Sequence, residues 1–155
     1  MDVSQLQCTY SDLYSSIFSE GIVNEQFTVM QQLGDENDPC FVYEMAALFF
    51  NSVPTQIDEL SKNLKQQVVE YKNIDVHVHT LKGASATFGA QRMINVCIDF
   101  LKYCCANDLQ GCLKCIQQLN QEFLELKIKV EALFKVEKQI VAAGGSVPIV
   151  ACKNT

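Results

Sequence analysis

The chain has 155 residues, 48% of them hydrophobic, and a formal net charge of −6 at pH 7. This length and apolar content are enough for one compact domain with its own core, which we predict over residues 1–147, with a flexible tail at 148–155. The acidic balance argues against nucleic acid as a direct partner, because neutralising phosphates requires clustered lysine and arginine. Since the sequence has neither an apolar run of about 18 residues nor a secretory leader, we expect a soluble, intracellular protein without membrane insertion.

Apolar residues recur at helical spacing along nearly the whole chain, and only three prolines and seven glycines interrupt them. This pattern predicts an all-α protein. The first predicted helix covers residues 3–19 and ends before Gly21. A shorter helix covers 24–32, and residues 33–37 form a loop.

A long third helix follows, with Asp38 as its N-cap and Pro39 in its first turn, where a missing N–H costs nothing. Pro54 lies inside this helix and removes a backbone hydrogen bond, so the helix should kink or break. We favour a kink, because the apolar spacing resumes in phase at Ile57 and Leu60. The predicted buried stripe of this helix comprises Phe41, Met45, Leu48, Phe49, Ile57, Leu60, Leu64 and Val68.

Three further helices complete the prediction. One begins near Asn73, which is a candidate cap, and ends at Gly89; the next covers 91–106; the last begins after the cap Asp108 and ends at Gly144 and Gly145. The fifth helix is expected to bury Ile94, Cys97, Ile98 and Leu101. The last helix is expected to bury Leu109, Cys112, Leu113, Ile116, Leu119, Phe123, Leu126, Val130, Leu133 and Phe134. Four long helices joined by short turns predict an antiparallel four-helix bundle with two additional N-terminal helices.

The segment 76–85 places a nucleophile, a cation and a gap on one helical face. Lys82 and Gly83 lie three and four residues after His79, so the three positions are neighbours on a helix surface. Neutral imidazole is nucleophilic near pH 7, and a lysine is a flexible positive charge for phosphoryl oxygens. Gly83 removes a side chain that would obstruct a docking partner, at a cost of roughly 1 kcal/mol of helix stability. Ser85 lies about 240° around the helix from His79, so we expect a packing or local hydrogen-bonding role for it.

The alternative for His79 is an ordinary surface histidine on an amphipathic helix. His77 serves as an internal comparison, because it lies roughly 200° around the helix from His79 and has no lysine or glycine at matching offsets. We interpret His77 as structural or incidental. The two histidines cannot chelate one metal ion as an i,i+4 pair could.

Eight cysteines raise the question of disulfides or a metal site. Without a secretory signal they are expected to be reduced thiols that pack as small apolar residues. Cys112 and Cys115 form a CxxC pair, but their surroundings look helical, whereas zinc-binding pairs usually occupy turns. We therefore predict no metal site. Cys152 is fourth from the end, but the residues after it do not fit a prenylation motif.

The pattern formed by His79, Lys82, Gly83 and Ser85, with the continuation 88–92, resembles the signature of plant-type histidine-containing phosphotransfer (HPt) proteins, and the resemblance covers about 6–147. Thr80 stands where glutamine is common in that family. The resemblance implies a phosphocarrier rather than an enzyme. In this interpretation His79 accepts a phosphoryl group from the receiver domain of a hybrid sensor histidine kinase and passes it to a response regulator in cytokinin-type signalling.

The same resemblance implies that the chain has no cofactor of its own, because Mg²⁺ is supplied by the partner receiver domains, and that it is a monomer in the cytoplasm and nucleus. Gln91 is a candidate for local support of the site. Candidate receiver-docking residues are Ile22, Val23, Phe27 and Phe41; the alternative is that these four fill the core. Two other functions compete: a non-transferring adaptor that binds the same receiver domains, and a helical metal or redox protein that uses the cysteines.

Overall fold

The computed structural model describes residues 2–34 and 38–148. These residues form six α-helices and no strand. The helices are α1 (Val3–Ser19), α2 (Glu25–Leu33), α3 (Phe41–Leu64), α4 (Tyr71–Phe88), α5 (Gln91–Cys105) and α6 (Leu109–Ala142). Part of the predicted loop (35–37) and most of the predicted tail (149–155) lie outside the described residues, so the domain boundary at 147 stays a prediction.

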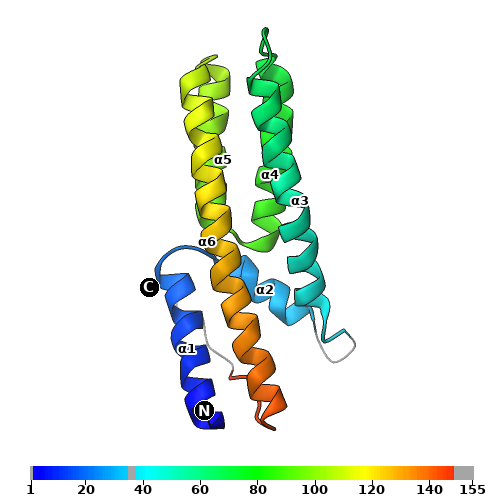
Figure 1. The fold of residues 1–155 in the computed structure, drawn as a ribbon, viewed down its shortest axis with the longest axis vertical. Helices are drawn as coiled ribbons and strands as arrows, with labels where there is room; N and C mark the ends of the chain where they lie inside the picture. Colours follow the sequence, from blue (N-terminus) through cyan, green and yellow to red (C-terminus); the bar gives the residue numbers. More distant parts are fainter. Residues whose placement is uncertain (1, 35–37, 149–155) are drawn as a thin grey trace.

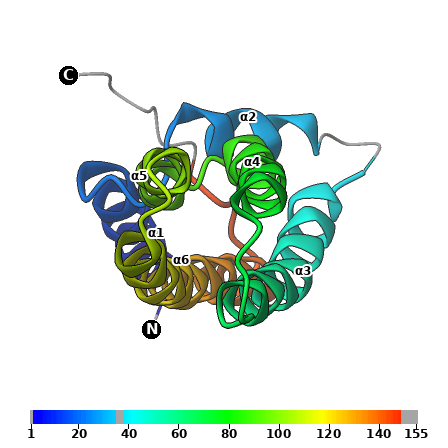
Figure 2. The same ribbon diagram turned by 90° about the horizontal axis from the view of Figure 1, so that it is seen from above.

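Helices α3, α4, α5 and α6 run alternately up and down and enclose a common core (Figures 1 and 2). The long α6 extends below the other three, and α1 packs along its lower part, while α2 lies across the lower ends of α3 and α4. The prediction of an antiparallel four-helix bundle with two additional N-terminal helices is confirmed. None of the described helices is both long enough and apolar enough to cross a membrane.

Several helix ends follow local sequence signals. Helix α1 has the predicted bounds, and Asp2 caps it by accepting a hydrogen bond from the Gln5 N–H. Asp108 caps α6 through the Gly111 N–H at 3.0 Å. Gly89 ends α4 in the left-handed conformation, with φ of 85°, which favours glycine because it has no Cβ. These termini could be predicted because the groups involved are close together in the chain.

Two predicted caps are wrong. Helix α3 begins at Phe41 with Cys40 as its N-cap, so Asp38 does not cap it and Pro39 precedes it. Helix α4 begins at Tyr71, which packs against the core, so Asn73 lies in its first turn. Neither helix has a side-chain cap hydrogen bond at its N-cap. Packing of the first apolar side chain decides where α4 starts, and this overrides the local preference for a capping residue.

The predicted buried faces were partly wrong. Helix α3 is continuous through Pro54, as predicted, but Leu48 is exposed, and Val68 is exposed beyond the end of the helix. In α5 the buried residues are Met93, Cys97, Phe100 and Cys104; Ile94 and Leu101 are only half-buried, and Ile98 is exposed. The predicted stripe for α6 was better, because eight of its ten residues are among the thirteen that are buried; the other two, Leu109 and Leu113, are half-buried.

An aromatic cluster joins the lower end of α4 to its neighbours. Phe88 of α4 stacks on Phe49 of α3, with ring centroids 4.6 Å apart, and also contacts Phe27 of α2 at 5.7 Å. Phe50 and Phe123 complete the cluster. Buried aromatic side chains contribute strongly to core stability. The cluster therefore fixes the end of the helix that carries His79.

A second contact joins α1, α3 and α6 below the bundle. The carboxylate of Glu137 is buried and accepts hydrogen bonds from the hydroxyls of Tyr10, at 3.0 Å, and Tyr43. Burial raises the pKa of Glu137, and the two hydrogen bonds lower it in part. Burial of the phenols and the nearby Glu137 carboxylate raise the pKa of both tyrosines.

Candidate functional site

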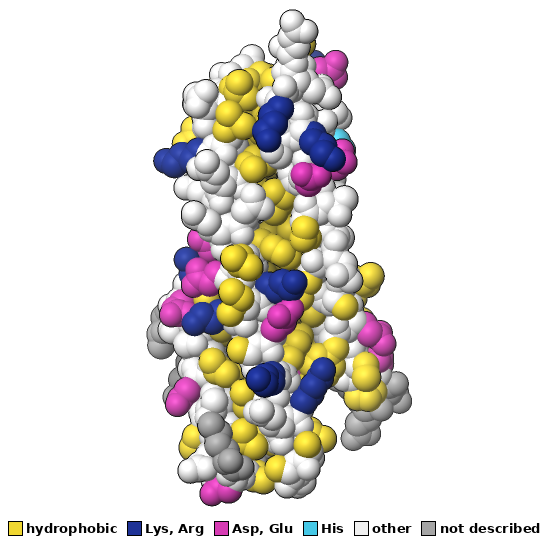
Figure 3. Space-filling view, in the orientation of Figure 1, with side chains coloured by type: hydrophobic (Ala, Val, Ile, Leu, Met, Phe, Trp, Pro, Cys, Tyr) yellow, Lys and Arg dark blue, Asp and Glu magenta, His cyan; other side chains and the backbone are white. Residues whose placement is uncertain are grey.

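His79 lies near the middle of α4, well inside the helix at both ends. The opposite side of α4 faces the core through Ile74, Val78, Leu81, Ser85 and Phe88. The imidazole therefore points outward, and 58% of the side chain is exposed. Figure 3 shows a different face, on which apolar side chains gather along the middle and the histidine colour appears only at the edge. The imidazole is accessible to another protein.

An unexpected neighbour of His79 is Asp75. Its Oδ2 atom lies 3.4 Å from His79 Nε2, an i,i+4 contact that is an ion pair when the imidazole is protonated. Asp75 was not among the site residues predicted from the sequence. A carboxylate four residues before a candidate nucleophile was the signal that could have found it.

Lys82 is half-buried, and among the described residues it forms no ion pair. Its positive charge acts on the thiol of Cys97 in α5, where it opposes the effect of burial on the pKa of that thiol. The ammonium of Lys82 is thus near enough to α5 for its charge to act on a buried thiol there. It remains able to attract an anionic group bound to His79.

Gly83 is exposed, and a Cβ built on it would meet no atom within 4 Å. The folded chain itself therefore does not require glycine at this position. Nearby hydroxyls are occupied by their own helix: Thr80 donates to the Val76 carbonyl and Thr87 donates to the Gly83 carbonyl, each at 3.1 Å. Consequently no side chain projects from position 83, and the surface beside His79 is open to an approaching partner.

Ser85 is fully buried, and its Oγ atom has no hydrogen-bond partner among the described residues. This placement fits the expected packing role and keeps Ser85 away from a phosphoryl group on His79. Gln91 lies beyond the end of α4. It accepts a hydrogen bond from Asn24 and donates one to Asn95, each at 2.8 Å. Gln91 therefore joins the start of α2 to α5 and contacts His79 through neither hydrogen bond.

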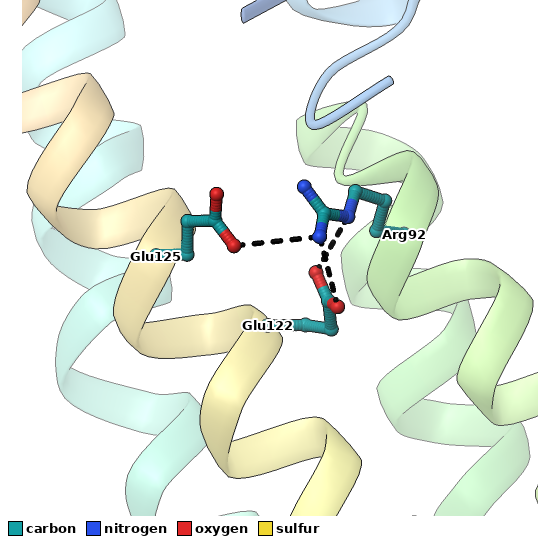
Figure 4. Close-up of polar contacts among 3 residues, drawn as sticks. All are labelled: Arg92, Glu122 and Glu125. Atoms are coloured by element: carbon teal, nitrogen blue, oxygen red, sulfur yellow. Dashed lines mark hydrogen bonds and ion pairs between the residues drawn. The ribbon is translucent and has the colours of Figure 1, made fainter. Parts of the chain in front are cut away.

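A cluster of charges also fastens α5 to α6 (Figure 4). Arg92 Nε lies 2.8 Å from Glu122 Oε2, and the guanidinium also reaches Glu125 at 3.4 Å. The two-pronged contact with Glu122 suits the planar guanidinium. This cluster holds the lower half of the bundle together.

The candidate docking residues fall in the core. Ile22, Val23 and Phe27 are each at most 3% exposed, so their prediction as docking residues is wrong. The turn after α1 and the buried side of α2 carry them beneath the end of α4. Phe41 is half-buried and packs against the core. An apolar residue that the sequence analysis missed is Val76, which is 61% exposed and lies three residues before His79.

The buried cysteines behave as core residues. Cys97, Cys104, Cys112 and Cys115 are buried, and the Sγ atoms of Cys104 and Cys112 are 4.0 Å apart. Burial raises the pKa of Cys97 to about 12 and that of Cys115 to about 11, so both thiols are protonated at neutral pH. The described part of the chain contains no group of three or more side chains placed to hold a metal ion. Cys152 lies outside the described residues.

Comparisons with known proteins agree with this geometry. Residues 44–133 match the Hpt domain family. The chain is 45% identical to histidine-containing phosphotransfer protein 1 of Arabidopsis thaliana over 97% of both chains. It is 34% identical to pseudo histidine-containing phosphotransfer protein 6 of the same plant, over 94% of this chain and 95% of that one.

A crystal structure of a histidine-containing phosphotransfer protein from Medicago truncatula superposes with a TM-score of 0.85, at 39% identity, and the match covers 91% of this chain and 96% of that chain. The matched family region contains α4 with His79, Lys82 and Gly83. The chain belongs to the Hpt family of histidine-containing phosphotransfer proteins.

Proposed function

We propose that this protein carries phosphoryl groups between receiver domains in a multistep phosphorelay, with His79 as the carrier residue. The observation that supports this most directly is an exposed imidazole in the middle of a helix, beside a lysine that forms no ion pair within the described part of the chain and a glycine with open space above it. The donor is the phosphorylated aspartate of a hybrid sensor histidine kinase, and the acceptor is the aspartate of a response regulator. The pathway that we propose is cytokinin signalling, in the cytoplasm and nucleus.

The transfer step needs few groups from the carrier. A ring nitrogen of neutral His79 uses its lone pair to form a P–N bond, while the P–O bond to the donor aspartate breaks and its electron pair returns to the carboxylate. The other ring nitrogen loses its proton to solvent. Lys82 attracts the phosphoryl oxygens, and Gly83 lets the receiver domain approach. The onward step is the reverse reaction on another aspartate.

We propose that Mg²⁺ acts only on the receiver domains, where it would neutralise the transferring group. The chain would then work as a stoichiometric carrier that is regenerated by each pair of transfers. It would not turn over a substrate by itself. The same proposal has the protein act as a monomer, which sedimentation of the purified protein can test.

The decisive experiment is transfer of labelled phosphate from a phosphorylated receiver domain to the wild-type protein, to His79→Gln and to His77→Gln. We expect label on the wild type and on His77→Gln, stable in base and labile in acid, and no label on His79→Gln. His77 is the matched control, since it is also exposed on α4 but on another face. Label that persists in His79→Gln would refute the assignment.

A receiver-binding adaptor is the second candidate, because the family also contains pseudo phosphotransfer proteins that match this chain over most of its length. The intact His79 favours the carrier. An adaptor would bind the receiver domains with unchanged affinity in both wild type and His79→Gln, and neither protein would acquire label. This outcome separates the two functions in the same assay.

A further inference from the structure

A negative charge lies directly beside the proposed carrier histidine. Asp75 Oδ2 is 3.4 Å from His79 Nε2, and 35% of the aspartate side chain is exposed. Among the described residues no lysine or arginine pairs with Asp75. The roles proposed above for Lys82 and Gly83 leave this carboxylate without a function.

The imidazole stands between opposite charges along α4. Asp75 is one helical turn before His79, and Lys82 is about one turn after it, so both are neighbours of the ring on the helix surface. An aspartate is ionised at neutral pH, and a phosphoryl group carries roughly −1.5 to −2 charges. Phosphorylating His79 therefore places two anionic groups close together, and Lys82 on the same helix surface partly offsets their charge.

We propose that Asp75 tunes the phosphoryl-transfer equilibrium by destabilising phosphorylated His79 relative to free His79. This proposal rests on the proposed function of His79. The free imidazole is neutral, or is attracted to the carboxylate when protonated, whereas the phosphorylated ring is repelled by it. Asp75 is thus a positioning residue that acts through its charge. It destabilises phosphorylated His79 and so favours onward transfer of the phosphoryl group, whereas Lys82 stabilises phosphorylated His79 enough for it to form.

The effect should be moderate, because both side chains contact water. The interaction energy of two unit charges a few ångströms apart in water changes an equilibrium constant severalfold. For exposed pairs of side chains this energy is at the low end of the observed values. With nearly two charges on the phosphoryl group, removing the Asp75 charge should move the equilibrium toward phosphorylated His79 by about three- to tenfold.

The test compares wild type, Asp75→Asn and a matched control, Asp58→Asn. Asp58 is also an exposed aspartate in an i,i+4 pair, with Lys62 at 3.0 Å, but it lies on α3. Each protein is equilibrated with a phosphorylated receiver domain and Mg²⁺, and the phosphate on each partner is measured. We expect the three- to tenfold shift for Asp75→Asn, none for Asp58→Asn, and the wild-type equilibrium for Asp75→Glu, which keeps the charge.

Salt provides a readout that a purely structural role would not affect. Raising the salt from about 0.05 to about 1 M shortens the screening length to about 3 Å, so the difference between wild type and Asp75→Asn should shrink. An unchanged equilibrium in Asp75→Asn, a shift toward the receiver domain, or a shift that ignores salt would overturn the proposal.

The outcome for the wild type separates the two proposals. If wild type takes no phosphate, the proposed function fails. If wild type is phosphorylated and Asp75→Asn has the same equilibrium, only the role of Asp75 fails. Should Asp75→Asn not fold, as judged by its circular dichroism, Asp75→Ser supplies the neutral side chain.

Discussion

Alanine at two glycines of the α4 segment should change stability in opposite directions. Gly83 is inside the helix, and a Cβ there meets nothing within 4 Å; replacing a helical glycine by alanine gains about 1 kcal/mol. Gly89 has φ of 85°, and its Cβ would lie 2.5 Å from the backbone nitrogen of Phe27 and 2.9 Å from Asn24 Oδ1. The left-handed conformation costs roughly 1–2 kcal/mol for other residues, and the contact with backbone adds to it.

We expect Gly83→Ala to raise Tm by roughly 2–4 °C, since about 1 kcal/mol has this effect in a domain of this size. Gly89→Ala should lose about 2–4 kcal/mol and lower Tm by roughly 4–16 °C. Thermal melts followed by circular dichroism measure both. The reasoning about open space is refuted if Gly83→Ala lowers Tm, and the reasoning about the close approach of α2 is refuted if Gly89→Ala leaves Tm unchanged.

Two substitutions at Gly83 separate stability from function. Gly83→Ala should accept phosphate from a receiver domain more slowly although it is more stable, and Gly83→Leu should be slower still, because the added side chain stands where the partner docks. Initial transfer rates at equal protein concentrations measure this. If both variants transfer at the wild-type rate, steric access does not explain Gly83.

Three further predictions follow from the core. Burial raises the folded-state pKa of Glu137 above its ordinary value of 4.5. The stability that Glu137 contributes is therefore present below pH 4.5 and is lost as pH rises through the raised pKa. Urea melts at several pH values across this range should give a free energy of unfolding that depends less on pH for Glu137→Gln than for the wild type. Phe88→Ala should lose about 3–5 kcal/mol in urea unfolding, since Phe88 stacks on Phe49 in a dense core; a loss below about 1 kcal/mol would contradict the packing. Native alkylation followed by mass spectrometry should modify the exposed cysteines much faster than the buried ones with raised pKa, and equal rates would contradict their burial; the exposed set is Cys8, Cys40 and Cys105, and the buried set is Cys97, Cys104, Cys112 and Cys115.

The sequence alone was sufficient for features that depend on neighbouring residues. Helical periodicity identified all six helices, and the caps at Asp108 and Gly89 were correct because a cap involves groups within one turn. The placement of His79, Lys82 and Gly83 on one face follows from helix geometry once α4 is known to be a helix. Asp75 obeys the same i,i+4 rule and could have been found in the same way.

The tertiary structure decided which side of each helix is buried. Helix α5 carries apolar residues on more than one side, so its spacing could not tell whether Ile98 or Phe100 faces the core; contact with α4 and α6 decides it. Likewise Ile22, Val23 and Phe27 are apolar whether they dock a partner or fill the core, and only the position of α2 beneath α4 shows that they are buried.

The hydrogen bonds of the buried Glu137 carboxylate could not be predicted from the sequence either, because its partners are distant in the chain. Glu137 lies 127 residues from Tyr10 and 94 residues from Tyr43, yet the three side chains share hydrogen bonds. No local pattern connects them, because contacts between distant segments depend on how whole helices pack. Periodicity and capping determined the helices and the reactive face of α4, whereas burial, long-range partners and the surroundings of each charge required the assembled bundle.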